Sequence, residues 1–350
     1  MVAVWSDNAA CKALVTRLGP SRTTGDRVGA FLELKQLVAA APAGALWGDV
    51  DLRSALLEAT SSKQPETVRL VALGLLVQLS SSSTGQDLLT DNEARAFILA
   101  SLDKDQPVSV QRKAALVMVN LVVAAARTLT ATDDWDMCKL LQTAIAAGRD
   151  QGVRACMLGA LWSAAMTGAD SQLLWKRVPL REEVVSCASP EQPEEVRINA
   201  FGILWAMAKE EKLREQMWAH AGAREVLLAG IATTERPTLR VKALELLRCL
   251  AKVHAQKGTV WQSHIVQRAL LESAAEGQPL RVREASLEVL VQLALDEGSC
   301  PSMLELDMQR LFEVAIADLR LTEGLRKQCR CRHVFLLELQ GWMEAQNQFG

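Results

Sequence analysis

A helical pattern recurs along this chain with a spacing of 42 or 43 residues. Six segments carry it: "VRLVALGLLVQL", "VQRKAALVMVNL", "VRACMLGALWSA", "VRINAFGILWAM", "LRVKALELLRCL" and "VREASLEVLVQL". Each begins at an apolar anchor residue: Val68, Val110, Val153, Val196, Leu239 and Val282. The residues at offsets +4, +5, +7 and +8 from the anchor are small or apolar in all six, as on one face of an α-helix. The period therefore predicts an array of similar helical units.

Each anchor helix follows a polar break that ends in proline. The break is Gln-Pro at Gln64-Pro65, Gln106-Pro107, Gln192-Pro193 and Gln278-Pro279, and Arg236-Pro237 takes the same role in a fifth unit. A second apolar segment, such as "FILASLDKDQP", precedes the break, and some units add a shorter one, as in "KLREQMWAHAGA". Because proline is tolerated at the start of a helix and not in its interior, each unit reads as helix, break, helix.

Composition agrees with a helical array. The chain has 49% apolar residues, only 4% aromatic residues and no Tyr, so packing must depend on Leu, Val and Ala, which suit close-packed helices. Weaker copies of the pattern stand near residue 28, "DRVGAFLELKQLVAAA", and near residue 325, "LRKQCRCRHVFLLELQGW". We predict an all-α, right-handed α-solenoid of about eight repeats. It forms one domain over 1–350, with an N-terminal capping unit at 1–50, regular repeats at 51–295 and a C-terminal capping unit at 296–350.

The segment "NAFGILWAMAKEEKLREQMWAHAGAREVLLAGI", followed by "PTLRVKALELLRCLA", resembles the armadillo repeat. The resemblance extends over nearly the whole chain, and helix starts such as "VREAS" are equally typical of the related HEAT repeat. It implies that the anchor helix is the third helix of its repeat and lines the concave face of a superhelix. It also implies a protein-binding scaffold, and no shared reaction.

One branch of this family, importin alpha, binds basic peptides through Trp at offset +6 and Asn at +10 of the third helix. Only Asn120 matches this pattern, so we do not expect a nuclear-import receptor, and we keep Asn120 as a candidate partner-binding residue. Offset +6 is instead glycine at Gly74, Gly159 and Gly202. Glycine inside a helix costs roughly 1 kcal/mol relative to alanine. We therefore expect a close approach there, by a neighbouring helix in preference to a bound backbone.

Trp162 and Trp205 share offset +9 in adjacent units. They are candidate anchors for a partner in a groove, since Trp is enriched at interface hot spots. The alternative is packing, because +9 lies one turn beyond the apolar offset +5. We favour packing and keep both residues as candidates for partner binding.

An arginine row occupies offset +1 in five units, with Gln111 as the exception: Arg69, Arg154, Arg197, Arg240 and Arg283. On a concave face, Arg154, Arg197 and Arg240 would suit an acidic peptide through bidentate pairing with carboxylates. The alternative, which we favour, is an internal ladder in which each arginine pairs with a carboxylate such as Glu66, Glu194 or Glu195.

The C-terminal "LRKQCRCRH" is strongly basic. It fits an acidic partner or RNA, although a solvated helix face is the default interpretation. Cys329 and Cys331 are two residues apart and so do not share a helix face, which argues against zinc. The other cysteines form no CxxC and read as small apolar residues.

The signatures of common enzymes are missing: there is no GxSxG, HExxH, GxxxxGK[ST] or GxGxxG. We therefore expect no enzyme, no cofactor and no metal. The net charge of -2 weakens the case for nucleic-acid binding. The N-terminus shows no secretory signal, and the longest apolar run is too short to cross a membrane. We expect a cytoplasmic protein, with the nucleus as the other option.

We expect the chain to be a non-catalytic scaffold that binds a peptide or helix of a protein partner on its concave face. The region 153–250 is the preferred location of this binding surface. We favour a monomer. An alternative is a co-chaperone, because "LRVKALELLRCLA" resembles the armadillo domain of Hsp70 nucleotide-exchange factors. A myosin-type chaperone, a piece of a longer armadillo protein and a HEAT-like nucleic-acid binder are further alternatives.

Overall fold

A computed structural model of the chain describes residues 9–40, 46–82, 85–128, 142, 144–146, 150–167 and 171–349. The secondary structure of these residues is entirely helical. The chain divides into two compact units, Met1–Glu183 and Val184–Gly350. Each unit is an all-α solenoid. The single domain over 1–350, with its capping units at 1–50 and 296–350, stays a prediction.

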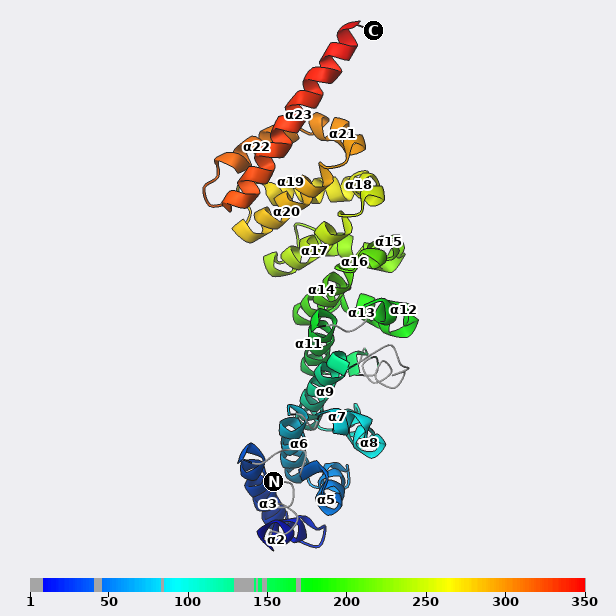
Figure 1. Cartoon of the computed structure of the whole chain (residues 1–350), viewed down its shortest axis with the longest axis vertical. Coiled ribbons are helices and arrows are strands. Elements are labelled where there is room, and N and C mark those ends of the chain that lie inside the picture. Colours follow the sequence, from blue (N-terminus) through cyan, green and yellow to red (C-terminus); the bar gives the residue numbers. More distant parts are fainter. Residues whose placement is uncertain are drawn as a thin grey trace. The chain divides into compact units, whose positions relative to one another are not determined.

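In the first unit, the long helices α3, α6, α9 and α11 pack each against the next, and shorter helices flank them (Figure 1). The helices are α2 (Ala9–Leu18), α3 (Thr24–Ala40), α5 (Val50–Thr60), α6 (Glu66–Ser80), α7 (Gly85–Thr90), α8 (Asn92–Ser101), α9 (Val108–Thr128), α11 (Gln151–Thr167), α12 (Ser171–Lys176) and α13 (Val178–Cys187), the last of which ends in the second unit.

The second unit repeats the arrangement, with α14, α17, α20 and α23 as the consecutive long helices (Figure 1). Its helices are α14 (Glu194–Ala208), α15 (Glu211–Ala219), α16 (Ala221–Gly230), α17 (Pro237–Leu250), α18 (His254–Trp261), α19 (His264–Ala274), α20 (Leu280–Leu293), the 3₁₀ turn η1 (Glu297–Ser299), α21 (Cys300–Glu305), α22 (Met308–Ala317) and α23 (Glu323–Phe349).

The six anchor residues lie in the core of their units, on α6, α9, α11, α14, α17 and α20. All of them are fully buried: Val68, Val110, Val153, Val196, Leu239 and Val282. The predicted apolar stripe is thus confirmed, and the 43-residue period is a period of core positions.

The proline breaks form the same tight turn in successive repeats. A backbone N–H just before the proline donates to the carbonyl three residues earlier. The pairs are Gln64 to Ser61 at 3.0 Å, Gln192 to Ser189 at 3.0 Å and Glu235 to Ala232 at 3.1 Å. Glu235 stands two residues before its proline, and the two glutamines stand one residue before theirs. Pro193 is the N-cap of α14, with an extended ψ of 144°, whereas Pro237 is the first residue of α17. The proline therefore fixes the chain direction at the start of the anchor helix.

Gly230, the last residue of α16, lies at a close approach of three helices in the second unit. A Cβ built there would lie 2.5 Å from Cζ of Phe201 on α14 and 3.1 Å from Cβ of Ala243 on α17. Phe201 and Ala243 are fully buried, so neither has free space in which to move. Glycine is needed at this position because three helices meet there.

None of the described helices has both the length and the apolar composition required to cross a bilayer.

Candidate functional site

The arginine row at offset +1 lies inside the helical stack. Its members are between 2% and 6% exposed: Arg69, Arg154, Arg197, Arg240 and Arg283. Arg27 on α3, which is 4% exposed, occupies the same place one repeat earlier. Arg27 was not predicted from the sequence because the residue before it, Asp26, is not an apolar anchor. Its spacing of 42 residues from Arg69 could have identified it as a member of the arginine row.

These arginines bind the break of the following repeat. Arg27 donates to Gln64 Oε1 at 2.6 Å, and Arg69 donates to Gln106 in the same way. Arg240 donates to Gln278 Oε1 at 2.9 Å and also to Ser273 Oγ at 2.7 Å. The glutamine of the Gln-Pro break is therefore the acceptor of a register ladder, a role that the sequence analysis did not assign to it.

Carboxylates take the acceptor position at two steps of the ladder. Arg197 pairs with both oxygens of Glu235, at 2.7 and 2.9 Å, and Arg283 pairs with Asp318. Glu235 stands four residues before the anchor Leu239, the position that glutamine has in the other repeats.

The expected carboxylates are not these acceptors. Glu194 accepts from Arg236 at 2.6 Å and from Thr238 at 2.7 Å, and Glu66 accepts from Ser109. Internal pairing of these arginines is thus observed, with carboxylates at two steps, but Glu66 and Glu194 were the wrong acceptors.

A second bond ties several of the arginines to the helix before their own. The Nε atoms of Arg27, Arg154 and Arg283 donate to the carbonyls of Leu18, Ile145 and Ala274, at 2.9 to 3.0 Å. Each carbonyl belongs to a residue nine positions earlier. A role for Arg154, Arg197 and Arg240 in binding a partner stays a prediction, and their burial favours the internal ladder.

Asn120 joins two helices of the first unit. Its Nδ2 donates to the carbonyl of Val77 and to Oγ of Ser80, both at 3.0 Å. Both acceptors lie in the last turn of α6, where the Val77 carbonyl also accepts from the N–H of Ser81 at 3.2 Å and from Oγ of Ser80 at 2.9 Å. The amide donors of Asn120 thus stabilise the end of α6, and its part in partner binding stays a prediction.

Trp205 lies half-buried on α14, between the core and the surface. The Nζ of Lys209 is 4.1 Å from the ring centroid, and the Nζ of Lys242, on α17, is 5.7 Å from it. Both distances are in the range of cation–π attraction. Trp162, at the same offset on α11 in the first unit, is also half-buried. Each indole therefore has one part in the core and one part accessible.

The glycines at offset +6 face open space where their surroundings are described. A Cβ built on Gly74 or on Gly159 would have no neighbour within 4 Å. The expected close approach by a neighbouring helix is therefore wrong at these two positions. The missing side chain leaves a gap on the surface of the third helix instead.

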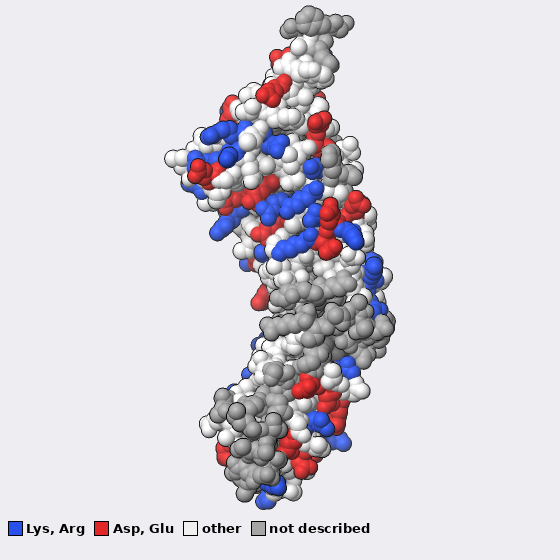
Figure 2. Space-filling view, viewed as in Figure 1, with Lys and Arg blue, Asp and Glu red and all other residues white. Residues whose placement is uncertain are grey.

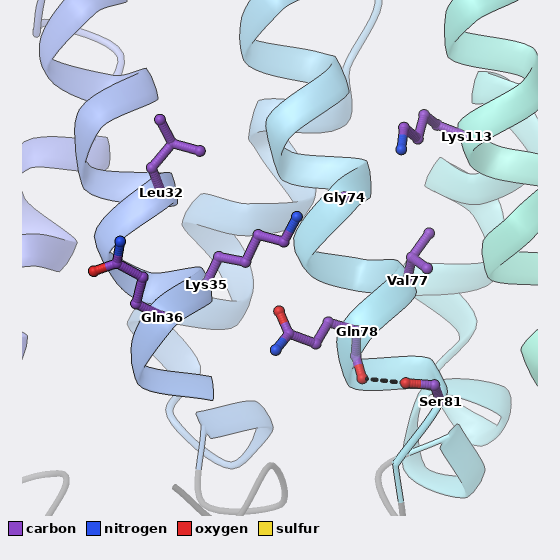
Figure 3. A pocket seen from close by; sticks show the side chains of 8 residues that line it. All are labelled: Leu32, Lys35, Gln36, Gly74, Val77, Gln78, Ser81 and Lys113. Carbon is purple, nitrogen blue, oxygen red and sulfur yellow. Dashed lines mark hydrogen bonds between the residues drawn. The ribbon is translucent and has the colours of Figure 1, made fainter. Parts of the chain in front are cut away.

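At Gly74 this gap is part of a groove across α3, α6 and α9 (Figure 3). The groove has a volume of about 660 Å³ and is open to solvent. Its lining combines two lysines, two glutamines, a serine and two apolar side chains around the glycine: Leu32, Lys35, Gln36, Gly74, Val77, Gln78, Ser81 and Lys113. No column of the repeat pattern contains this set, because the lysines stand at different offsets on different helices.

The third helices of the second unit have paired charges instead. Lys242 lies 2.9 Å from Glu245 on α17, and Arg248 pairs with Glu288 on α20. On the face of this unit drawn in Figure 2, Lys and Arg side chains lie next to Asp and Glu side chains. The surface there is mixed in sign, which is unlike a nucleic-acid footprint.

The basic segment at the start of α23 mixes buried and exposed groups. Cys329 is fully buried, and burial raises the pKa of its thiol to about 11, whereas Cys331 is exposed. His333 lies 3.2 Å from Glu313 on α22. Within the part of the chain that the structure describes, no group of His, Cys, Asp and Glu is arranged to hold a metal ion.

No protein-family model and no curated protein sequence matches the chain. Solved structures do match it. An engineered protein from a structural genomics programme is similar at 16% identity, with a TM-score of 0.64, over 96% of this chain and 80% of its own length. A structure from work on a phosphorylation switch that controls the interaction between cadherin and β-catenin is similar at 16% identity, with a TM-score of 0.58, over 96% and 70%.

A third similar structure is Kap121p, at 15% identity and a TM-score of 0.56. The match covers 93% of this chain but only 33% of Kap121p. The β-catenin and Kap121p matches are solenoids of the armadillo and HEAT types. At these identities the similarity concerns the fold alone, and it agrees with the predicted armadillo/HEAT-like helical repeat.

Proposed function

We propose that this chain is a non-catalytic protein-interaction scaffold that binds its partner on the face formed by the third helices of its repeats. The fold supports this proposal, since the similar structures include one from work on the cadherin–β-catenin interaction. The surface supports it as well, because the third helices carry both an accessible indole and an open groove.

The observation that carries the proposal is the environment of Trp205. Its Nε1 is buried and has no hydrogen-bond partner within the described part of the chain, while the residue as a whole is half-buried. Tryptophan usually finds an acceptor for its N–H when it is buried, and it is prominent among the residues that dominate binding energy. A partner that offers an acceptor after a small rearrangement would satisfy this donor. Trp162, on α11 of the first unit, is a separate candidate for a partner contact.

The test is the double variant Trp162→Ala/Trp205→Ala, in a comparison of the proteins that it and the unaltered chain capture from a lysate. Trp342→Ala, at a site 59% exposed on α23, is the matched control. We expect the double variant to lose the dominant captured protein, the control to keep it, and the melting temperature to change little. Capture by the double variant equal to that of the unaltered chain contradicts the proposal. A large fall in its melting temperature assigns the indoles to packing instead.

The identity of the captured protein separates this scaffold from the alternatives. Capture of Hsp70 together with accelerated nucleotide release would point to a co-chaperone. The proposal includes a cytoplasmic, monomeric chain without a cofactor, and size-exclusion chromatography with light scattering tests the monomer.

A further inference from the structure

In the second unit, two positions on the third helices hold cations, and a glutamate at offset +6 neutralises each. Lys242, at offset +3 of α17, pairs with Glu245, at +6 of the same helix, at 2.9 Å. Arg248, at offset +9 of α17, pairs with Glu288, at +6 of the following third helix, α20. Offset +6 is therefore the acidic column that balances these cations.

The first unit holds cations at the same two positions but lacks the acids. Lys35 stands at offset +9 of α3 when the ladder residue Arg27 is taken as offset +1, and the +6 position of the next third helix is Gly74. Lys113 stands at offset +3 of α9, and the +6 position of that helix is Leu116. Both lysines are exposed, and neither forms an ion pair with any residue that the structure describes.

The two lysines lie on opposite sides of the groove, with Gly74 between them (Figure 3). Leu32 and Val77 add apolar surface, and Gln36 and Gln78 add amide groups. The Oε1 of Gln78 is buried and has no hydrogen-bond partner among the residues that the structure describes, which is costly for an acceptor. The groove thus presents unbalanced positive charge, amide side chains, and room for a backbone at the glycine.

We propose that this groove binds an acidic, extended segment of a partner protein, whose carboxylates take the place of the missing glutamates. The inference deepens the proposed function and rests on it. Neighbouring helices pack about 8–10 Å apart, so a path from α3 to α9 is about 20 Å long. An extended chain covers about 3.3 Å per residue, and about six residues would therefore span the groove.

A peptide fits these groups better than a nucleic acid does. Nucleic-acid binding needs a row of cations along the phosphate backbone, whereas the groove has two lysines with amide and apolar groups between them. The amides of Gln36 and Gln78 suit the N–H and C=O groups of a peptide backbone, and Leu32 suits an apolar side chain of the segment.

The experiment is a selection from a phage-displayed library of random peptides of about ten residues. It uses the full chain, the variant Lys35→Glu/Lys113→Glu, and the control Lys63→Glu at an exposed lysine outside the groove. We expect the unaltered chain and the control to enrich Asp and Glu at two or more positions, and the double variant to lose that enrichment.

A second pair of variants tests the missing carboxylate directly. Gly74→Glu restores an acid at offset +6, where it would neutralise Lys35 as Glu288 neutralises Arg248. Gly159→Glu makes the same change at the equivalent position of α11, outside the groove and also in open space. Measured by fluorescence anisotropy with the best selected peptide, Gly74→Glu should weaken binding by about tenfold or more, and Gly159→Glu by less than about twofold.

Four results would overturn the inference. The first three are enrichment of non-acidic peptides, acidic enrichment that survives Lys35→Glu/Lys113→Glu, and equal binding by the two glycine variants. The fourth is preference for single-stranded RNA over the selected peptide in the same anisotropy assay. The proposed function fails separately: if Trp162→Ala/Trp205→Ala keeps every captured protein while the groove still selects acidic peptides, the tryptophan face is wrong and the groove stands.

Discussion

The substitution of glycine by alanine should have opposite effects on stability at Gly159 and Gly230. Gly159 lies in the interior of α11, and a Cβ there would meet nothing within 4 Å. Alanine is favoured over glycine inside a helix by about 0.8–1.0 kcal/mol. Gly159→Ala should therefore raise the free energy of unfolding by about that amount, since it gains helix propensity and encounters no steric conflict.

At Gly230 the added methyl group meets a filled space. Its Cβ would lie 2.5 Å from Cζ of Phe201 and 3.0 Å from Cε2 of the same ring, both closer than side-chain atoms normally approach. Overpacking of a core costs about 1–3 kcal/mol, which exceeds the gain in helix propensity. Gly230→Ala should therefore lower the free energy of unfolding by about 1–2 kcal/mol.

Urea denaturation followed by circular dichroism and by Trp fluorescence measures both changes. The double variant Phe201→Leu/Gly230→Ala is the control, because removal of the ring should cancel most of the cost of the methyl group. The cost of Gly230→Ala should then be smaller in the Phe201→Leu background than in the unaltered chain. Equal shifts of the same sign at Gly159 and Gly230, or no coupling to Phe201, would refute the packing argument.

Three further predictions concern the ladder and the C-terminal region. Arg240→Leu should cost about 2–3 kcal/mol by urea denaturation, because it removes the donors to Ser273 and Gln278, whereas Arg281→Leu, at a side chain 87% exposed, should cost less than about 0.5 kcal/mol. Iodoacetamide followed by mass spectrometry should label Cys331 and leave Cys329 protected until unfolding, since Cys329 is buried with a thiol pKa of about 11; equal labelling of both would contradict the packing of α23. Hydrogen bonds from Arg320 and Arg283 hold the pKa of Asp318 well below its ordinary value. The ionised carboxylate therefore stabilises the folded state fully at pH values above the ordinary pKa of Asp, and this stabilisation is lost as the pH falls toward the lower pKa of the folded state. Asp318→Asn should thus lower the melting temperature more at neutral pH than in acid, and an equal loss at both would exclude linkage.

The sequence predicted the parts of the fold that depend on a single column of the repeat. The apolar anchors and the arginine at offset +1 recur in chain order, so counting by 42 or 43 residues finds them, and the burial of the anchors follows from the apolar stripe they belong to. The burial of the arginines was not predicted. The ladder was preferred over a binding stripe because a cation in the first turn of a helix opposes the helix dipole and favours a nearby carboxylate.

The acceptors of the ladder could not be assigned from charge alone. Only carboxylates were expected as acceptors, so Gln64, Gln106 and Gln278 were not predicted, although the Gln-Pro breaks were recognised as part of the repeat. The acceptor lies in the following repeat, and the carbonyl oxygen of a side-chain amide can accept from a guanidinium although it carries no charge. The arginine and its glutamine acceptor are 37 or 38 residues apart in the sequence, and only the packed structure shows that they form a hydrogen bond.

The groove was missed for a related reason. Lys35, Gly74 and Lys113 stand at offsets +9, +6 and +3 of three different helices, so no comparison within one column brings them together. The glycine column was noticed but explained by a close approach, because propensity predicts only that glycine is costly in a helix and not what lies beside it. Whether Trp162 and Trp205 contact a partner stays a prediction.

The ladder makes each repeat dependent on the identity of its successor. An arginine in one repeat finds its acceptor in the break of the next, so the insertion or loss of part of a repeat would leave a buried guanidinium opposite the wrong residue. Gain or loss of a whole repeat keeps an arginine paired wherever the break that follows it supplies an acceptor, as Gln64, Glu235 and Gln278 do. A chain of this kind can therefore lengthen or shorten during evolution in steps of one complete repeat, and changes of any other length would carry a cost in stability at each place where the register is broken.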